Sequence, residues 1–267
     1  MKARHLGALL SVLAAVVWLV PYVWMVLTSL RPLSDILARP TAVVPERVTV
    51  DAYVDVFHTI DVPRTLLVTT AMAVSIACLQ ILFALPAGYA LAKLSFRGRA
   101  AFAALVLGCL LVPAQVTFVP VFAMLAEVRL VNSFPALVVP FAASAFGTFM
   151  VQKALSYVPD ELIEAARLDG ASELTIVYRI LAPILKPTLV SLFLLSFVFH
   201  WNDYFWPLVM TTDDRVRTLP LAVALFREQG TGVRWHLVMA ANVVLSVPAL
   251  ALFVAAQRQL FRAVSSR

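Results

Sequence analysis

The sequence predicts an all-α integral membrane protein with six transmembrane helices. Of its 267 residues, 62% are hydrophobic and only 13% are charged, and the mean hydropathy is +0.91. A soluble domain usually has about a quarter of its residues charged, so this chain carries too few polar side chains for a soluble surface. The composition excludes a disordered protein, a nucleic-acid-binding arm and a disulfide scaffold, and it indicates lipid as the solvent.

Six apolar segments are long enough to cross a bilayer as helices, for which about 20 residues are needed. They are Leu6–Leu30, Thr65–Ala92, Ala101–Leu125, Ser133–Val151, Thr188–Met210 and His236–Gln257. Because backbone amides in lipid must bond within their own segment, we expect helices despite the many Val and Ile residues. The first segment is too long for a signal peptide and no small-residue cleavage site follows it, so we interpret it as a retained helix.

The distribution of Lys and Arg places both termini on the cytoplasmic side. With the N-terminus inside, the inner segments hold 12 of these residues and the outer loops hold 9. The positive-inside rule gives most weight to short loops, and there the contrast is sharper: residues 93–99 hold three positive charges, whereas residues 126–132 hold one. This bias also explains the net charge of +6 without an anionic partner.

The loops suggest how the chain is organised. We expect a first helix with its outer loop over residues 1–63, a transmembrane core over residues 64–260 and a short cytoplasmic tail over residues 261–267. The outer loop Thr211–Trp235 contains an apolar stretch, Leu219–Phe226, that is too short to span a membrane and predicts an interfacial or re-entrant helix. We expect neither a disulfide nor a metal site, because both cysteines lie in apolar runs and no Cys/His spacing suggests ligands.

The longest inner loop, Ser156–Pro187, has the pattern of two short helices around a glycine. A proline followed by two acidic residues at 159–161 favours a helix N-terminus, and Gly170 supplies a left-handed stop. Ser172 can cap the second helix, and two prolines then break the chain as it returns to the membrane. The residues alone suit either a knob that docks into a partner or an ordinary solvated connector.

Four polar residues in the predicted helices are candidates for a translocation pathway: Gln115, Thr117, Asn202 and Asp203. Asp203 is the only acid inside a predicted helix, where a mid-bilayer charge costs roughly 2.5–3.5 kcal/mol on insertion scales. The aromatic residues around Asp203 and Asn202 also suit an anchor at the outer interface, so both roles stay open. For Gln115 and Thr117 the alternative is helix packing, which we favour. No nucleophile–base pair is evident, and we expect no catalytic site.

The inner loop resembles the EAA loop found in the membrane subunits of bacterial ABC importers, with the pattern EAA, three residues, G, nine residues, I-x-L-P. The matching positions are Glu164, Ala165, Ala166, Asp169, Gly170, Ile180 and Pro183. Within this loop the departure is Ala182, where the family usually has Leu, and a further departure is the end AVSSR, where family members often continue with a Gly-containing tail. The segments GYALAKLSFRGR, VPAQVTFVP, WNDYFWPL and RTLPLAV extend the resemblance to carbohydrate permeases of the MalG type, over roughly Arg64–Gln257.

This resemblance implies a type I ABC importer fold and a permease subunit for a sugar or sugar derivative, which works by alternating access in the bacterial inner membrane. It implies that the EAA residues couple the chain to an ATPase. The implied partners are a second permease subunit, an extracytoplasmic solute-binding protein and two ATP-binding subunits, which would hold the ATP and Mg. Independently, none of the eight glycines belongs to a GxxxxGK[ST] phosphate loop, so the chain cannot bind ATP by that device.

Three alternatives remain at this stage. An ABC permease for a non-sugar solute fits the same motifs. A secondary transporter without an ATPase usually shows inverted repeats and several intramembrane ionisable residues, whereas we find no repeat and one candidate acid. A membrane-embedded enzyme would need a cluster of catalytic polar residues in the helices, and the sequence does not show one.

Overall fold

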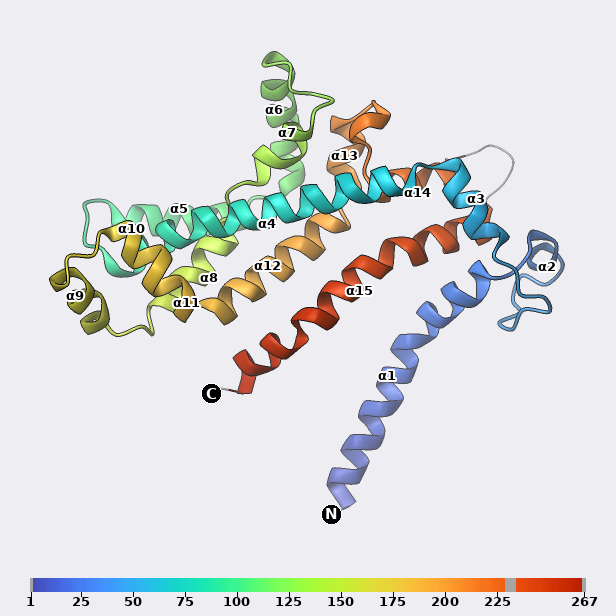
Figure 1. Cartoon of the computed structure of the whole chain (residues 1–267), viewed down its shortest axis with the longest axis horizontal. Coiled ribbons are helices and arrows are strands. Elements are labelled where there is room, and N and C mark those ends of the chain that lie inside the picture. The colour runs from blue at the N-terminus through green and yellow to red at the C-terminus, as the bar shows by residue number, and fades with distance from the viewer. Residues whose placement is uncertain (1, 229–233, 266–267) are drawn as a thin grey trace. The chain divides into compact units, whose positions relative to one another are not determined.

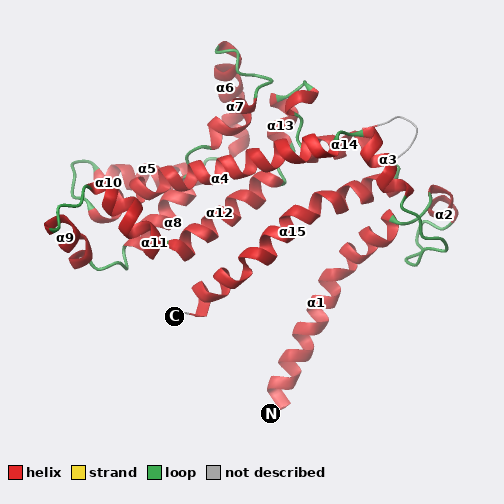
Figure 2. Ribbon diagram, in the orientation of Figure 1, coloured by secondary structure: helices red, strands yellow, loops and turns green. Residues whose placement is uncertain are grey.

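Every regular element in the computed structural model is a helix over the residues that the structure describes, which are 2–228 and 234–265 (Figure 2). Three helices contain segments long and apolar enough to cross a membrane: α1 (Lys2–Ser29), α4 (Val62–Lys93) and α15 (Trp235–Ser265) (Figure 1). The number rises to 6 if each of three bent helix pairs is one span. The chain divides into two compact units, of which unit 1 comprises Met1–Leu66 with Thr218–Pro248 and unit 2 comprises Leu67–Arg217 with Ala249–Arg267.

Unit 1 contains α1, the first residues of α4, most of the spanning part of α15 and three shorter helices. The shorter helices are α2 (Leu33–Ala38), α3 (Asp51–Thr59) and α14 (Leu219–Glu228). The apolar face of α3 packs with α14 and the start of α15 in one buried core, with Val56, Leu219 and Leu237 at its centre. The short helix predicted over Leu219–Phe226 is therefore present as α14, whereas α2 and α3 were not predicted.

A buried arginine holds the turn between α1 and α2. Arg31 is 1% exposed, and its Nε donates to the Asp35 carboxylate at 2.8 Å. Its other nitrogens donate to the carbonyls of Ala42, Asp35 and Arg39. Hydrogen bonds from Arg31, which has the larger effect, and from Arg39 lower the pKa of Asp35 to about 2. A buried guanidinium is stable here because nearly every donor has an acceptor.

Unit 2 contains the rest of α4 and the C-terminal part of α15, with a succession of shorter helices between them. In chain order these are α5 (Arg99–Leu111), α6 (Ala114–Glu127), α7 (Phe134–Val138), η1 (Val139–Phe141), α8 (Ala145–Leu155), α9 (Asp160–Leu168), α10 (Glu173–Thr175), η2 (Ile176–Leu181), α11 (Ala182–Ile184), α12 (Lys186–Trp201), α13 (Phe205–Met210) and η3 (Asp214–Val216). Two apolar cores hold most of these helices: one joins α4, α8, α9, η2 and α12, and the other joins α4, α6, α7 and α13.

The predicted third span, Ala101–Leu125, is wrong as a single helix, because α5 and α6 meet at an angle of 101°. The cause is Pro113, which disfavours helical backbone at the preceding residue. Val112 accordingly has an extended conformation, with φ −83° and ψ 117°. The predicted fourth span, Ser133–Val151, also bends, by 41°, between η1 and α8.

The predicted fifth helix was expected to reach Met210, but α12 ends at Trp201. Asn202 and Asp203 therefore lie between α12 and α13 rather than inside a helix, because Asn and Asp side chains favour caps and turns over helix interiors. The last helix, predicted to end at Gln257, continues to Ser265, so most of the expected tail extends α15.

Candidate functional site

The first helix of the inner loop, α9, begins where the sequence predicts. Pro159 has an extended backbone with φ −60° and ψ 140° and directly precedes the helix. Asp160 and Glu161 occupy the first turn. Acidic side chains in this position interact favourably with the positive end of the helix dipole.

A glycine ends α9 through a left-handed turn, as predicted. Gly170 has φ +82°, and its N–H donates to the carbonyl of Arg167 at 3.0 Å. The N–H of Ala171 donates to the carbonyl of Ala166 at 3.0 Å. These two bonds form a Schellman motif, which satisfies carbonyls left free at the helix end and requires the conformation that glycine adopts at no steric cost.

The two faces of α9 differ in their surroundings. Ile163 and Ala166 are buried in the core of unit 2, at 3% and 7% exposure. Glu164 and Ala165 are exposed, and Leu168 is 89% exposed. Of the EAA residues, Ala166 thus holds the helix onto its own chain, while the other two lie on a surface open to a partner.

The second half of the loop is also helical. The Ser172 hydroxyl accepts a hydrogen bond from the N–H of Thr175 at 3.3 Å and so caps α10, as predicted. The helical run through α10, η2 and α11 reaches Ile184 and then bends by 85° into α12. Ile180 packs against the core of unit 2, and Pro183 is exposed shortly before the bend.

An ion pair bridges the glycine turn. Arg167 Nε in the last turn of α9 donates to Glu173 Oε1 at the start of α10, at 2.9 Å. This hydrogen bond raises the pKa of Arg167, and the Tyr89 hydroxyl beside the guanidinium adds to the effect. Both side chains are about half exposed, at 42% and 51%, so the pair orients the turn more than it stabilises it. Asp169, next to the glycine, is exposed.

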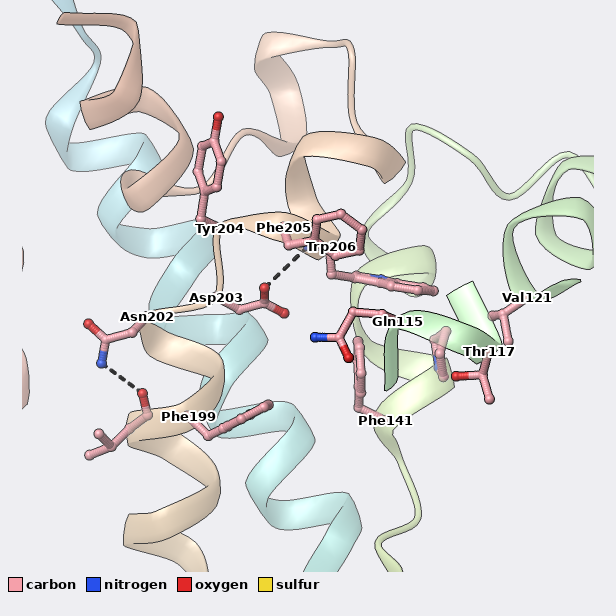
Figure 3. A pocket seen from close by; sticks show the side chains of 12 residues that line it. Gln115, Thr117, Val121, Phe141, Phe199, Asn202, Asp203, Tyr204, Phe205 and Trp206 are labelled. Carbon is pink, nitrogen blue, oxygen red and sulfur yellow. Dashed lines mark hydrogen bonds between the residues drawn. The ribbon is translucent and has the colours of Figure 1, made fainter. Parts of the chain in front are cut away.

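All four predicted pathway residues line one cavity of about 570 Å³ in unit 2 (Figure 3). This volume lies in the range of small-molecule sites. Gln115 and Thr117 come from the start of α6, and Asn202 and Asp203 from the break after α12. Figure 3 shows the Gln115 amide and the Asp203 carboxylate facing the same space.

Asp203 has a structural partner as well as a place in the cavity. Its Oδ1 accepts a hydrogen bond from the N–H of Trp206 at 3.2 Å, so the carboxylate caps the start of α13. The indole of Trp206 donates from Nε1 to the carbonyl of Ala136 at 2.9 Å and lies edge-on to the ring of Phe141. Among the described residues that line the cavity, Asp203 carries the only charge.

Sequence reasoning missed two exposed apolar residues in the inner loop. Leu168 is 89% exposed at the end of α9, and Tyr157 is 86% exposed just before it. Apolar side chains that are exposed outside the apolar spans have no lipid to cover them, so these two residues are candidates for contact with a partner protein. The sequence did contain a signal: Leu168, in the stretch ARLDG, does not lie on the helix face that Ile163 and Ala166 share.

Relatives share most of the chain. The family model for binding-protein-dependent transport system inner membrane components matches residues 84–266. The arabinooligosaccharides transport system permease protein AraQ of Halalkalibacterium halodurans is 29% identical over 241 residues, which cover 89% of this chain and 86% of that protein. The sn-glycerol-3-phosphate transport system permease protein UgpE of Salmonella typhi is 33% identical over 192 residues, which cover 72% of this chain and 68% of that protein.

Solved structures share the fold. A chain in the crystal structure of a bacterial ABC transporter involved in the import of the acidic polysaccharide alginate aligns with a TM-score of 0.83 at 21% identity, over 97% of both chains. A chain of the alginate transporter in complex with an alginate pentasaccharide-bound periplasmic protein aligns with a TM-score of 0.61 at 17% identity, over 97% of this chain and 96% of that chain.

Proposed function

Because this chain belongs to the family of binding-protein-dependent transport system inner membrane components, we propose that it forms half of the translocation pathway of an ATP-driven ABC importer for a sugar. It is a permease, a transport component of the inner membrane with several membrane-spanning helices, and not an enzyme. A second permease subunit supplies the other half of the pathway. A solute-binding protein delivers the substrate from outside.

The proposed topology has six spans, both termini in the cytoplasm and the loop Ser156–Pro187 on the inner face. Three long helices and three bent helix pairs supply the spans. The excess of Lys and Arg in the short segment 93–99 supports the orientation. This topology places α9 where a cytoplasmic ATPase can reach it.

The observation that carries the proposal is the outer face of α9. Leu168, Glu164 and Ala165 are exposed on a helix whose other face is fixed in the core of its own chain. Burying a leucine side chain contributes about 1.5–3 kcal/mol, which is enough to matter at a small docking surface. We assign this surface to one of two ATP-binding subunits, which hold the ATP and Mg. Closure of the ATPase pair then moves α9 and switches the helices between inward-open and outward-open states.

The cavity favours a neutral sugar over an acidic or phosphorylated one. Its aromatic rings, among them Tyr204 and Phe205, can stack on a sugar ring, while Gln115, Thr117 and Asn202 can bond hydroxyl groups. Its one charge, on Asp203, repels an anion, and Coulomb repulsion grows as water is excluded. Among the relatives, the name of AraQ points to arabinooligosaccharides, whereas UgpE and the alginate transporter are named for anionic substrates.

The test compares Leu168→Asp with Leu37→Asp. Both leucines are exposed, at 89% and 73%, but Leu37 lies on α2 in the proposed outer loop. We expect Leu168→Asp to lose co-purification of the ATP-binding subunit and ATP-dependent uptake, with normal membrane insertion, whereas Leu37→Asp keeps both. Retention of the ATPase by the Leu168 variant contradicts the docking assignment. Uptake that an ion gradient drives without any ATPase identifies a secondary transporter instead, and uptake of a non-sugar solute contradicts the substrate class.

A further inference from the structure

The last turn of α4 carries two buried polar side chains that point to the same neighbour. Tyr89 and Lys93 are four residues apart, so they lie on one face of the helix. The Tyr89 residue is 3% exposed and the Lys93 side chain is 8% exposed. Such groups are rarely buried without partners, and here their partners lie at opposite ends of α9.

Tyr89 holds the C-terminal end of α9. Its hydroxyl donates to Glu173 Oε2 at 2.5 Å and accepts from Arg167 Nη2 at 3.0 Å. Arg167 is in the last turn of α9 and Glu173 begins α10, so one hydroxyl joins α4 to both sides of the glycine turn.

Lys93 holds the N-terminal end of α9. Its ammonium group donates to Asp160 Oδ1 at 2.6 Å and to the carbonyl of Val158 at 2.5 Å. Asp160 is the first residue of the helix, and Val158 lies two residues before it. The lysine thus fixes both the helix start and the chain that leads into it.

Apolar contacts complete the attachment between these two points. Ile163 and Ala166, on the buried face of α9, lie in the same core as Tyr89 and Leu85 of α4. A rotation of α9 against α4 would break the charge-assisted hydrogen bonds at one end or the other, together with this packing. These contacts attach α9 to the end of α4 at both ends of α9 and along its buried face.

We propose that Tyr89 and Lys93 are positioning residues that fix α9 to α4 at both ends, so that a displacement of α9 by a docked ATPase moves α4 directly. The inference rests on the proposed function, because it takes α9 as the surface that the ATPase moves. It adds that α4, which is distant from α9 in sequence, is a transmembrane helix that receives the motion through direct contacts. When either Tyr89 or Lys93 loses its contacts, the other residue still holds one end of α9. The effect of losing both sets of contacts on coupling should therefore exceed the combined effect of the single losses.

The test uses the complete transporter in proteoliposomes with its binding protein, and the variants Tyr89→Phe, Lys93→Met and the double variant. Phenylalanine keeps the ring in the core and removes only the hydroxyl, and methionine keeps most of the lysine stem. Tyr178→Phe is the matched control, because the Tyr178 hydroxyl donates to the carbonyl of Leu82 on α4, at 2.8 Å, and not to a residue of α9.

We expect each single variant to keep the ATP-binding subunits bound and to raise the ATP hydrolysed per solute molecule by at least roughly two- to tenfold, because each loses two hydrogen bonds and one alone contributes a factor in that range. The double variant should exceed the product of the two single effects. Backbone amides of α9 should exchange hydrogen faster in the double variant, with exchange elsewhere unchanged. Tyr178→Phe should match the wild type in all three measurements.

A double variant that transports with the wild-type ATP ratio, or whose α9 amides exchange at the wild-type rate, overturns the inference. This result is distinguishable from failure of the proposed function. If the proposed function fails, Leu168→Asp also keeps its ATPase and its transport. If only the attachment of α9 to α4 fails, Leu168→Asp is defective and the double variant is normal.

Discussion

Replacing Gly88 with alanine should destabilise the protein at the crossing of α4 and α8. A Cβ atom at Gly88 would lie 2.7 Å from Val151 Cγ1, 2.9 Å from Val151 Cβ and 2.9 Å from the backbone nitrogen of Gln152. A Cβ atom does not approach other heavy atoms more closely than 3.0 Å, and the backbone of α8 cannot yield as a flexible side chain can. The two helices must therefore separate or strain.

The size of the effect follows from two opposing terms. Overpacking a tight interior costs about 1–3 kcal/mol. Alanine in place of glycine inside a helix recovers about 1 kcal/mol. Since the clash involves backbone, we expect the upper end of the range and a net loss of about 2 kcal/mol.

Two other glycines supply a graded control. At Gly108 in α5 a Cβ meets nothing within 4 Å, so Gly108→Ala should be neutral or stabilising. At Gly147 its tight contacts are with the methyl groups of Leu192, at 3.2 and 3.3 Å, which a rotamer change can relieve, and Ser144 Cβ lies at an ordinary contact distance of 3.4 Å. The measurement is the thermal unfolding midpoint of the assembled transporter in one detergent. We expect the midpoint to be highest for Gly108→Ala, lower for Gly147→Ala and lowest for Gly88→Ala.

A double-mutant cycle gives the sharper test. Val151→Gly removes two of the three close atoms and leaves the Gln152 nitrogen, but it also removes a side chain that is buried in the core. Val151→Gly should therefore lower the midpoint less in the Gly88→Ala background than in the wild type. Equal midpoints for Gly88→Ala and Gly108→Ala would refute the reasoning.

Three further outcomes are expected. Gly170 has open space around it but φ +82°, so Gly170→Ala should destabilise the protein by roughly 1–2 kcal/mol through backbone conformation alone and weaken co-purification of the ATPase. Gly170→Asn should keep most of the co-purification, and equal losses in the two variants would contradict this reasoning. The pKa of Asp35 falls from 3.8 to about 2 on folding through its pairing with Arg31, so the stability it gives is present above pH 4 and is lost as the pH falls to 2. The difference in protease resistance between wild type and Asp35→Asn should therefore shrink over that interval, and a constant difference would count against the pair. Trp206→Phe leaves the buried carbonyl of Ala136 without its donor, which should cost about 1–3 kcal/mol in thermal unfolding, and an unchanged midpoint would show that the indole N–H is dispensable.

The features that depend on local sequence were predictable. Long apolar runs predicted α1, α4 and α15, and the caps and the glycine predicted α9 and its neighbour, because each signal lies within a few residues of its effect. The resemblance found in the same loop is confirmed by the family match over residues 84–266. The four pathway residues do share one cavity, although their role stays a prediction.

The features that depend on distant contacts were not predictable. Tyr89 meets Glu173 across 84 residues of chain, and Lys93 meets Asp160 across 67. Helical periodicity fixes which face of α4 these residues share, but it does not say what packs against that face. The break after Trp201 was missed for another reason. The run FVFHWNDYFWPL is mostly apolar, so its average hydropathy predicts a continuous helix even though Asn202 and Asp203 end α12.

Three interruptions in the membrane helices border the cavity in unit 2, whereas the bend between α11 and α12 lies at Leu185, which is buried in an apolar core. Gln115 follows the break between α5 and α6, Phe141 precedes the break before α8, and Asp203 lies in the break after α12, and all three line the cavity. In lipid, non-helical backbone is tolerated only where it is buried in protein or faces a water-filled space, because each unsatisfied N–H or C=O costs several kcal/mol. Breaks that faced the bilayer would therefore be selected against. Helix-breaking residues such as Pro113 are therefore best accommodated close to the cavity, where the neighbouring Gln115 can bind water or a solute hydroxyl.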